Sequence, residues 1–170
     1  TVNVSSTRMD FSGAGAGTEA QFVILGSLIG ATDNNATIRA QEDARVTFGD
    51  AGNAATVDLN DGTGGTESIE TRTGGHIEFL NTTDPVTLND SATNSEVAGE
   101  TSTITVGDGS TNPNIVVTGN NNFETTFAGP GIFNLNSGTW TQNANNWITG
   151  QGAETVATVN IGGGATAAVM

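Results

Sequence analysis

The 170-residue chain contains no cysteine, no lysine and no tyrosine, and it has one histidine and three prolines. Without cysteine it has neither a disulfide framework nor a thiolate metal site, and a single histidine leaves zinc without a ligand set. Four arginines against 18 acidic residues give a net charge of −14. Such an acidic chain is a poor partner for nucleic acid or for an anionic membrane surface, so we expect no nucleic-acid partner.

Long apolar runs are also missing. The longest, Phe22–Ile29, is interrupted by Gly26 and Ser27, whereas a spanning helix needs about 20 apolar residues, so we expect no membrane insertion. The sequence opens at Thr1 without an initiator methionine or a signal peptide, which favours a processed, exported form over an excised fragment. A lysine-free surface rich in Thr, Asn and Gly also favours a secreted or cell-surface location.

A repeat is the clearest positive feature of the sequence. The segment Val57–Asp61 returns as Val86–Asp90, 29 positions later. An apolar-x-apolar triplet followed by a turn residue is typical of a short strand with one face on a core. The same frame predicts three columns of inward residues: Phe48, Phe79, Val106, Leu135 and Ile161; then Leu59, Leu88, Val117 and Ile148; then Ile69, Val97, Phe127 and Val156.

This pattern predicts an all-β, single-domain parallel β-helix, or β-solenoid. Helix formers are sparse, and Gly and Asn recur at short intervals between the apolar triplets. A chain that repeats strand and turn about every 29 residues buries its inward side chains only by stacking each round on the next. We expect about five to six rungs of three short strands each.

Residues 1–45 follow the frame loosely, so we expect an irregular N-terminal rung or cap there and regular rungs over 46–170. The best alignment places Phe11, Leu25 and Ile38 one round before Phe48, Leu59 and Ile69. The excess length then falls in loops over 13–17 and 32–35. The alternative is a helix over Phe22–Ile29 that caps the coil.

The rungs ITVGDGSTNPNIVVTGNNNFETTFAG (104–129) and VNIGGGATAAV (159–169) resemble the β-helical passenger regions of bacterial surface proteins of the autotransporter and filamentous-haemagglutinin type. The resemblance extends from about residue 36 onward and carries no catalytic motif. It implies a right-handed coil and an extracellular setting.

The end of the sequence predicts an open strand edge. Val159–Ile161 begins a new round, and the residues after it form no charged or proline-rich cap, although solenoids normally cover their ends. Either the chain continues in a longer protein or a second copy covers the edge. The predicted assembly edges are Val2, Val4, Val159, Ile161, Ala165, Ala167 and Val169, and Thr1–Ser5 is a candidate added strand for a neighbour.

Two turn columns and one corner segment are candidate ligand sites. Asp50, Asn81 and Asp108 share one turn column, and Asp61 and Asp90 share another. Their side-chain oxygens suit Ca²⁺, which is the one candidate cofactor. The alternative is that these residues were selected only because Asp and Asn favour turns. Trp140 and Trp147, with amides between them, are candidate glycan-binding residues, and the alternative is that both indoles pack against the coil.

The sequence favours a non-enzyme. General acid–base chemistry needs a positioned pair, whereas the outward Glu70 and Glu78 are explained as solvated strand residues and His76 as a solvent-facing corner residue. We expect a structural subunit whose partners are copies of itself, joined head to tail into a filament or surface matrix. One alternative is an adhesin or spike segment that binds a glycan through a lateral face or the Trp140–Trp147 loop. The other is a donor-strand pilin built as an antiparallel sandwich.

Overall fold

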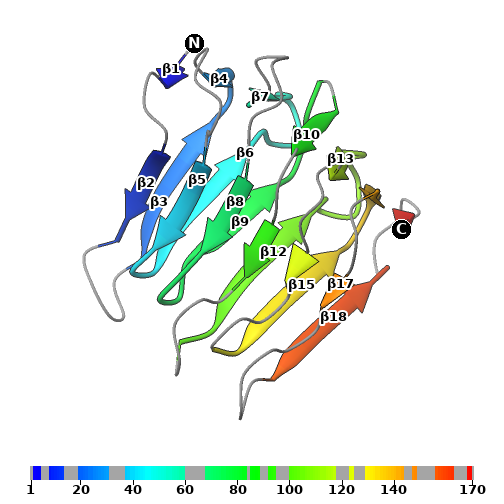
Figure 1. The fold of residues 1–170 in the computed structure, drawn as a ribbon. Coiled ribbons are helices and arrows are strands. Elements are labelled where there is room, and N and C mark those ends of the chain that lie inside the picture. The colour runs from blue at the N-terminus through cyan, green and yellow to red at the C-terminus, as the bar shows by residue number, and fades with distance from the viewer. Residues whose placement is uncertain are drawn as a thin grey trace.

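The computed structural model describes residues 2–4, 8–13, 19–30, 37–59, 68–83, 85–88, 92–94, 100–117, 123–124, 129–143, 147–148, 156–162 and 168–169. These residues form 19 strands, all paired in parallel, and the described chain contains no helix. It therefore contains no helix that would cross a bilayer. The fold is a β-solenoid, as predicted, and Figure 1 shows its strands stacked in order from the N-terminus to the C-terminus.

The strands follow one another around three faces in strict rotation. The first face holds β1 (Val2–Val4), β4 (Ser27–Gly30), β7 (Thr56–Asp58), β10 (Val86–Leu88), β13 (Asn114–Val117), β16 (Gly138–Gln142) and β19 (Ala168–Val169). The second holds β2 (Arg8–Ser12), β5 (Thr37–Gln41), β8 (Ser68–Thr71), β11 (Ala92–Asn94), β14 (Phe123–Glu124) and β17 (Trp147–Ile148). The third holds β3 (Ala20–Ile24), β6 (Ala44–Phe48), β9 (His76–Phe79), β12 (Ser102–Val106), β15 (Gly131–Leu135) and β18 (Ala157–Ile161).

The second and third faces are each a continuous six-stranded sheet, which agrees with the predicted five to six rungs. The first face is split into β1-β4-β7 and β10-β13-β16-β19. A single parallel bridge between Ala55 and Thr82 joins the two parts. The chain between Val57 and Val86 is longer than the chain between the bridged residues Ala55 and Thr82. The extra residues lie before β10 and account for the break.

The core is a set of apolar ladders along the coil axis. On the third face Phe48, Phe79, Val106, Leu135 and Ile161 lie in one register column, as predicted. The first four of these side chains are fully buried. The rings of Phe48 and Phe79 stack with centroids 5.1 Å apart and planes 13° apart. Successive rungs therefore place like side chains directly over one another, because parallel in-register strands are spaced about 4.8 Å apart.

The corner after the third face depends on glycine at alternate rungs. Gly49 and Gly107 have φ angles of 76° and 75°, a region that side chains with a Cβ rarely adopt. A Cβ at Gly49 would lie 2.1 Å from the Asn81 carbonyl oxygen, and one at Gly107 would lie 2.1 Å from Ser137 Oγ. These two glycines thus let the corner of the next rung sit directly against their backbone.

The third predicted column is wrong beyond Ile69. Ile69 pairs with Ala92, Ala92 with Phe123, and Phe123 with Trp147. The number of residues between successive members of this column varies, because the corners differ in length. The nearly regular spacing of apolar residues in the sequence therefore predicted the wrong partners. Val97 and Phe127 lie outside the described residues. Val156 lies outside any strand.

The second predicted column is confirmed for Leu88 and Val117, which pair in register, but not for Ile148. Trp140 pairs with Ile115 on the first face, whereas Ile148 belongs to β17 on the second. The reason is the tight corner at Gly138, where β16 follows β15 almost directly. β16 therefore takes the first-face position that the sequence analysis assigned to the segment around Ile148.

The N-terminal residues stack in the same three-face order as the rest. Ile38 pairs with Ile69, as predicted, but the other two proposed alignments are wrong. Phe11 pairs with Ala40, while Ile24 lies over Phe48 and Leu28 over Val57. Two strands, β3 and β4, occupy the segment considered for a capping helix. The parallel pairing throughout the described strands also excludes the antiparallel sandwich.

The Phe ladder makes a direct stability prediction. Phe79→Ala removes a fully buried ring and leaves a cavity between two rungs, so we expect a loss of about 3–5 kcal/mol in the free energy of unfolding. Chemical denaturation followed by circular dichroism measures this loss. Val23→Ala, at an exposed position of β3, is the matched control and should change stability by less than about 0.5 kcal/mol. Equal losses in the two variants would contradict the stacked core.

Candidate functional site

The C-terminal end of the coil exposes apolar side chains whose equivalents in β6, β9, β12 and β15 are buried. Val159 and Ile161 of β18 lie over Phe133 and Leu135. The two lower residues are fully buried, whereas Val159 is 36 % exposed and Ile161 is 50 % exposed. The difference arises because no described strand lies above β18.

The N-terminal end also leaves apolar side chains partly exposed. Phe22 and Ile24 of β3 lie in register with Val46 and Phe48 and pack against the core, but they are only partly buried. No described strand pairs with the outer edge of β3. Both ends therefore present a strand edge beside half-covered apolar groups, which is the arrangement that solenoids normally cover.

The predicted assembly-edge residues divide into placed and unplaced positions. Val2 and Val4 lie in β1, which pairs with β4 of the same chain, and Val169 lies in β19, which pairs with β16. Val159 and Ile161 lie on the open edge of β18. Ala165 and Ala167 lie outside the described residues. Assembly through these edges stays a prediction.

The outer surface of the first three rungs carries two ion-pair ladders that the sequence interpretation missed. Asp10, Arg39 and Glu70 occupy one register position on successive strands of the second face. Arg39 forms an ion pair with Glu70, and its Nη1 lies 3.9 Å from Asp10 Oδ1. Their near-constant spacing along the chain, with alternating sign of charge, is the signal that would have identified this ladder.

The second ladder lies on the third face. Arg45 lies between Glu19, with its Nη2 3.0 Å from Glu19 Oε2, and Glu78, with which it also pairs. The Arg45 hydrogen bond lowers the pKa of Glu19. Further along the same face, Asn134 donates to Thr105 Oγ1 at 3.2 Å and Asn160 donates to Asn134 Oδ1 at 2.8 Å, so uncharged ladders replace the ion pairs.

His76 lies beside Arg45 on this face and is partly buried rather than fully solvent-facing as expected. Burial and the neighbouring Arg45 charge lower its pKa. Its register neighbour on the other side is Thr103. Glu70 and Glu78, the outward carboxylates noted in the sequence, form ion pairs with arginine. These two ion pairs link successive rungs on the outer surface of the coil.

The acidic turn column holds Asp50, Asn81 and Asp108 at equivalent positions after the paired residues Phe48, Phe79 and Val106. Asp50 Oδ1 accepts hydrogen bonds from the backbone N–H groups of Gly52 at 2.8 Å and Asn53 at 2.7 Å. Asn81 donates from its side chain to the Asp50 carbonyl at 3.0 Å. Asn81 therefore separates the two carboxylates by one rung, so they are not directly stacked.

Asp108 closes the same kind of turn. Its Oδ1 accepts from the backbone N–H groups of Ser110 at 2.8 Å and Thr111 at 3.0 Å, and these bonds hold its pKa well below the usual range. The Gly52 and Asn53 bonds lower the pKa of Asp50 in the same way. The described residues contain no group of three or more His, Cys, Asp or Glu side chains arranged for a metal ion. Asp61 and Asp90 lie outside the described residues.

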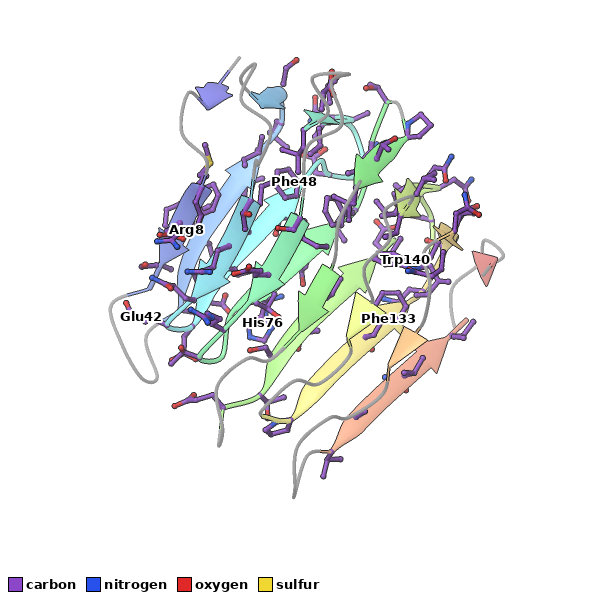
Figure 2. The ribbon with its side chains drawn as sticks, in the orientation of Figure 1. Arg8, Glu42, Phe48, His76, Phe133 and Trp140 are labelled. Carbon is purple, nitrogen blue, oxygen red and sulfur yellow. The ribbon has the colours of Figure 1, made fainter. Side chains whose placement is uncertain are left out.

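The predicted glycan-binding pair is not supported at Trp140. The Trp140 indole is fully buried in β16 and meets the Phe133 ring edge-on, with centroids 5.0 Å apart (Figure 2). A buried indole offers no face to a sugar, so the prediction is wrong for Trp140, which belongs to the core. The backbone of Trp147 belongs to β17, and its side chain lies outside what the structure describes.

Comparison with known proteins adds no relative. No protein-family model matches the chain, and no curated protein and no solved structure matches it. The β-solenoid arrangement is shown by the strands themselves. The finer likeness to autotransporter passenger regions depends only on composition and rung pattern.

The Asp108 turn predicts a specific pH dependence. Because the folded pKa lies below the ordinary 3.8, ionised Asp108 stabilises the fold above about pH 4, and this contribution is lost as the pH falls below that value. Asp108→Asn keeps an acceptor oxygen without the charge. We expect the melting temperature of the wild type to fall more steeply between pH 5 and pH 2 than that of the variant. Parallel curves would contradict the ionised turn.

The calcium hypothesis makes a separate prediction. If Ca²⁺ binds the column of Asp50 and Asp108, EGTA will lower the melting temperature of the wild type at neutral pH. The double variant Asp50→Asn, Asp108→Asn should lose this response. An unchanged melting temperature in EGTA, with the wild type first saturated with Ca²⁺, would refute the hypothesis.

Proposed function

We propose that this protein is a structural subunit that polymerises head to tail through the two ends of its coil, in an extracellular filament or surface matrix. The edge of β18, which no described strand covers, carries the proposal. Its inward residues Ala157, Val159 and Ile161 have the same spacing as Ala20, Phe22 and Ile24 of β3. A second copy placed with its β3 above β18 would continue the third-face ladder in register.

The existing rungs support this continuation. Within one chain, Ala20, Phe22 and Ile24 already lie over Ala44, Val46 and Phe48. The small-large-large order of the inward side chains is thus the same on β18, β3 and β6. Stacking β18 on the next β3 would bury Val159 and Ile161 as fully as their equivalents Phe133 and Leu135.

The charge distribution also favours contact at this end. Residues 126–170 contain a single charged side chain, Glu154, although the whole chain carries a net charge of −14. The other 17 acidic residues all precede residue 126 in the sequence. End-to-end contact therefore avoids most of the like-charge repulsion that side-by-side contact between two copies would create.

A head-to-tail contact joins two different surfaces, so it repeats without closing and gives a filament. The acidic, lysine-free composition supports an extracellular setting, and the autotransporter-like rung pattern supports a bacterial-surface type of solenoid. We propose no enzymatic activity. The adhesin alternative is less well supported at Trp140, which is buried, and it stays a prediction for the lateral face and for Trp147.

Electron microscopy of the purified chain over a range of concentrations tests the proposal. We expect fibres for the wild type and discrete particles for Ile161→Asp, which puts a charge into the inward ladder at the contact. Val156→Asp is the matched control: Val156 is 64 % exposed and lies just before β18, outside the strand, so fibres should persist. Discrete wild-type particles at every concentration would overturn the proposal.

A further inference from the structure

The chain turns from the third face to the first face by two kinds of corner. Ala55 lies seven positions after Phe48, the last residue of β6. Its bridge partner on the next rung, Thr82, lies only three positions after Phe79, the last residue of β9. Because Phe48 and Phe79 pair in register, the corner after β6 is four residues longer than the corner after β9.

The next two rungs repeat this difference in length. Pro113 lies seven positions after Val106, whereas Gly138 lies three positions after Leu135. Gly138 is the neighbour of Pro113 on the following rung, since the Thr139 N–H donates to the Pro113 carbonyl at 2.9 Å. We call the longer corners wide and the shorter corners tight. The wide corners are residues 49–54 and 107–112, and the tight corners are residues 80–81 and 136–137.

Backbone hydrogen bonds hold each tight corner on the strand end of the wide rung before it. The N–H groups of Leu80 and Asn81 both donate to the Phe48 carbonyl, at 2.9 and 3.1 Å. The two residues of the other tight corner donate in the same way to the Val106 carbonyl, at 2.9 and 3.4 Å. A tight corner therefore uses both lone pairs of one carbonyl group in the rung before it.

The wide corners have a different pattern of hydrogen bonds. The first residue of each is a glycine whose N–H donates to the strand-end carbonyl of the rung before it, at 2.9 Å from Gly49 and 2.8 Å from Gly107. The second residue, Asp50 or Asp108, accepts hydrogen bonds on its carboxylate from N–H groups of its own corner. The extra residues of a wide corner thus form a turn that its own aspartate closes.

A tight corner also fills the space beside the glycine of the wide corner before it. A Cβ at Gly107 would overlap Ser137 Oγ and the Ser137 carbonyl oxygen. A Cβ at Gly49 would overlap the Asn81 carbonyl oxygen. Asn136, the first residue of a tight corner, carries a side chain where the wide corners have glycine. A tight corner stacked on another tight corner would therefore bring a Cβ against the backbone of the next rung.

We infer that the repeating unit of this coil is two rungs, one with a wide corner and one with a tight corner, and that each kind of corner packs against the other kind. Residues 44–59 and 102–117 align without a gap, 58 positions apart, and both contain the segment Thr-x-Gly-Asp. The 29-residue spacing of the sequence is half of this period. The coil therefore gains or loses two rungs without a change in its corner contacts, whereas a single rung changes them.

Duplication within the full-length chain tests the two-rung unit. One variant carries residues 75–130 twice in tandem, which adds one tight and one wide corner and preserves the alternation. The junctions keep the strand register, because His76, Thr103 and Ile132 occupy one register position on successive strands. The added rungs bury apolar side chains between paired neighbours, so we expect a melting temperature equal to or above that of the wild type. Thermal unfolding followed by circular dichroism, at one protein concentration for all chains, measures it.

The two halves of this duplication are the matched controls. Tandem duplication of residues 75–101 stacks one tight corner on another, where the Leu80 Cβ would meet the backbone of the added rung. Tandem duplication of residues 102–130 stacks one wide corner on another and places two Asp108 carboxylates on adjacent rungs, about 4.8 Å apart. Each half adds one rung of apolar core, yet we expect each to lower the melting temperature by several degrees.

The three duplications together decide the inference. A lower melting temperature in both halves, but not in the combined duplication, supports the two-rung unit. A wild-type or higher value in either half, or a fall in the combined duplication as large as that in the halves, would overturn it. All three variants keep strands β1–β3 and β16–β19 unchanged, so the comparison does not depend on whether copies assemble end to end.

Discussion

Parallel, in-register backbone pairing between successive rungs is the constraint on which the structure depends. Each strand satisfies its hydrogen bonds only with the strands of the rungs before and after it, so inward side chains must lie over one another. The ladder from Phe48 to Ile161 is the direct result. The lateral surface follows from the same rule, because outward residues also stack, as in the ion pairs of Arg39 and Arg45.

The same rule makes the two ends the chemically distinct parts of the molecule. Along the sides, Arg39 forms an ion pair with Glu70, and the turn carboxylate of Asp108 accepts hydrogen bonds from backbone N–H groups. At the C-terminal end no described strand covers β18, and Ile161 is half exposed, whereas its equivalents on the inner rungs are buried. A function based on the ends therefore needs no separate binding pocket. It needs only a second molecule that supplies a rung to pair with the strand edges.

The first face shows the same dependence among the described residues. A strand lies on both sides of β13, whereas β19 pairs with Gly138 and Thr139 at the start of β16. At the other end of β16, the buried side-chain amide of Gln142 has no hydrogen-bond acceptor.

The pattern of residues was enough to predict the fold class, the approximate number of rungs and the third-face ladder. Each third-face strand from Val46 to Ile161 combines period-2 alternation with a Gly or Asn turn residue just after it. The pattern was not enough for the columns around Ile69 and Ile148, or for the alignment of Phe11 and Leu25. Corners of unequal length shift the register without leaving a local mark in the sequence. The folded coil was needed to show that Trp140 is core and that Arg39 and Arg45 bridge rungs, because burial and strand pairing depend on neighbours a full turn away.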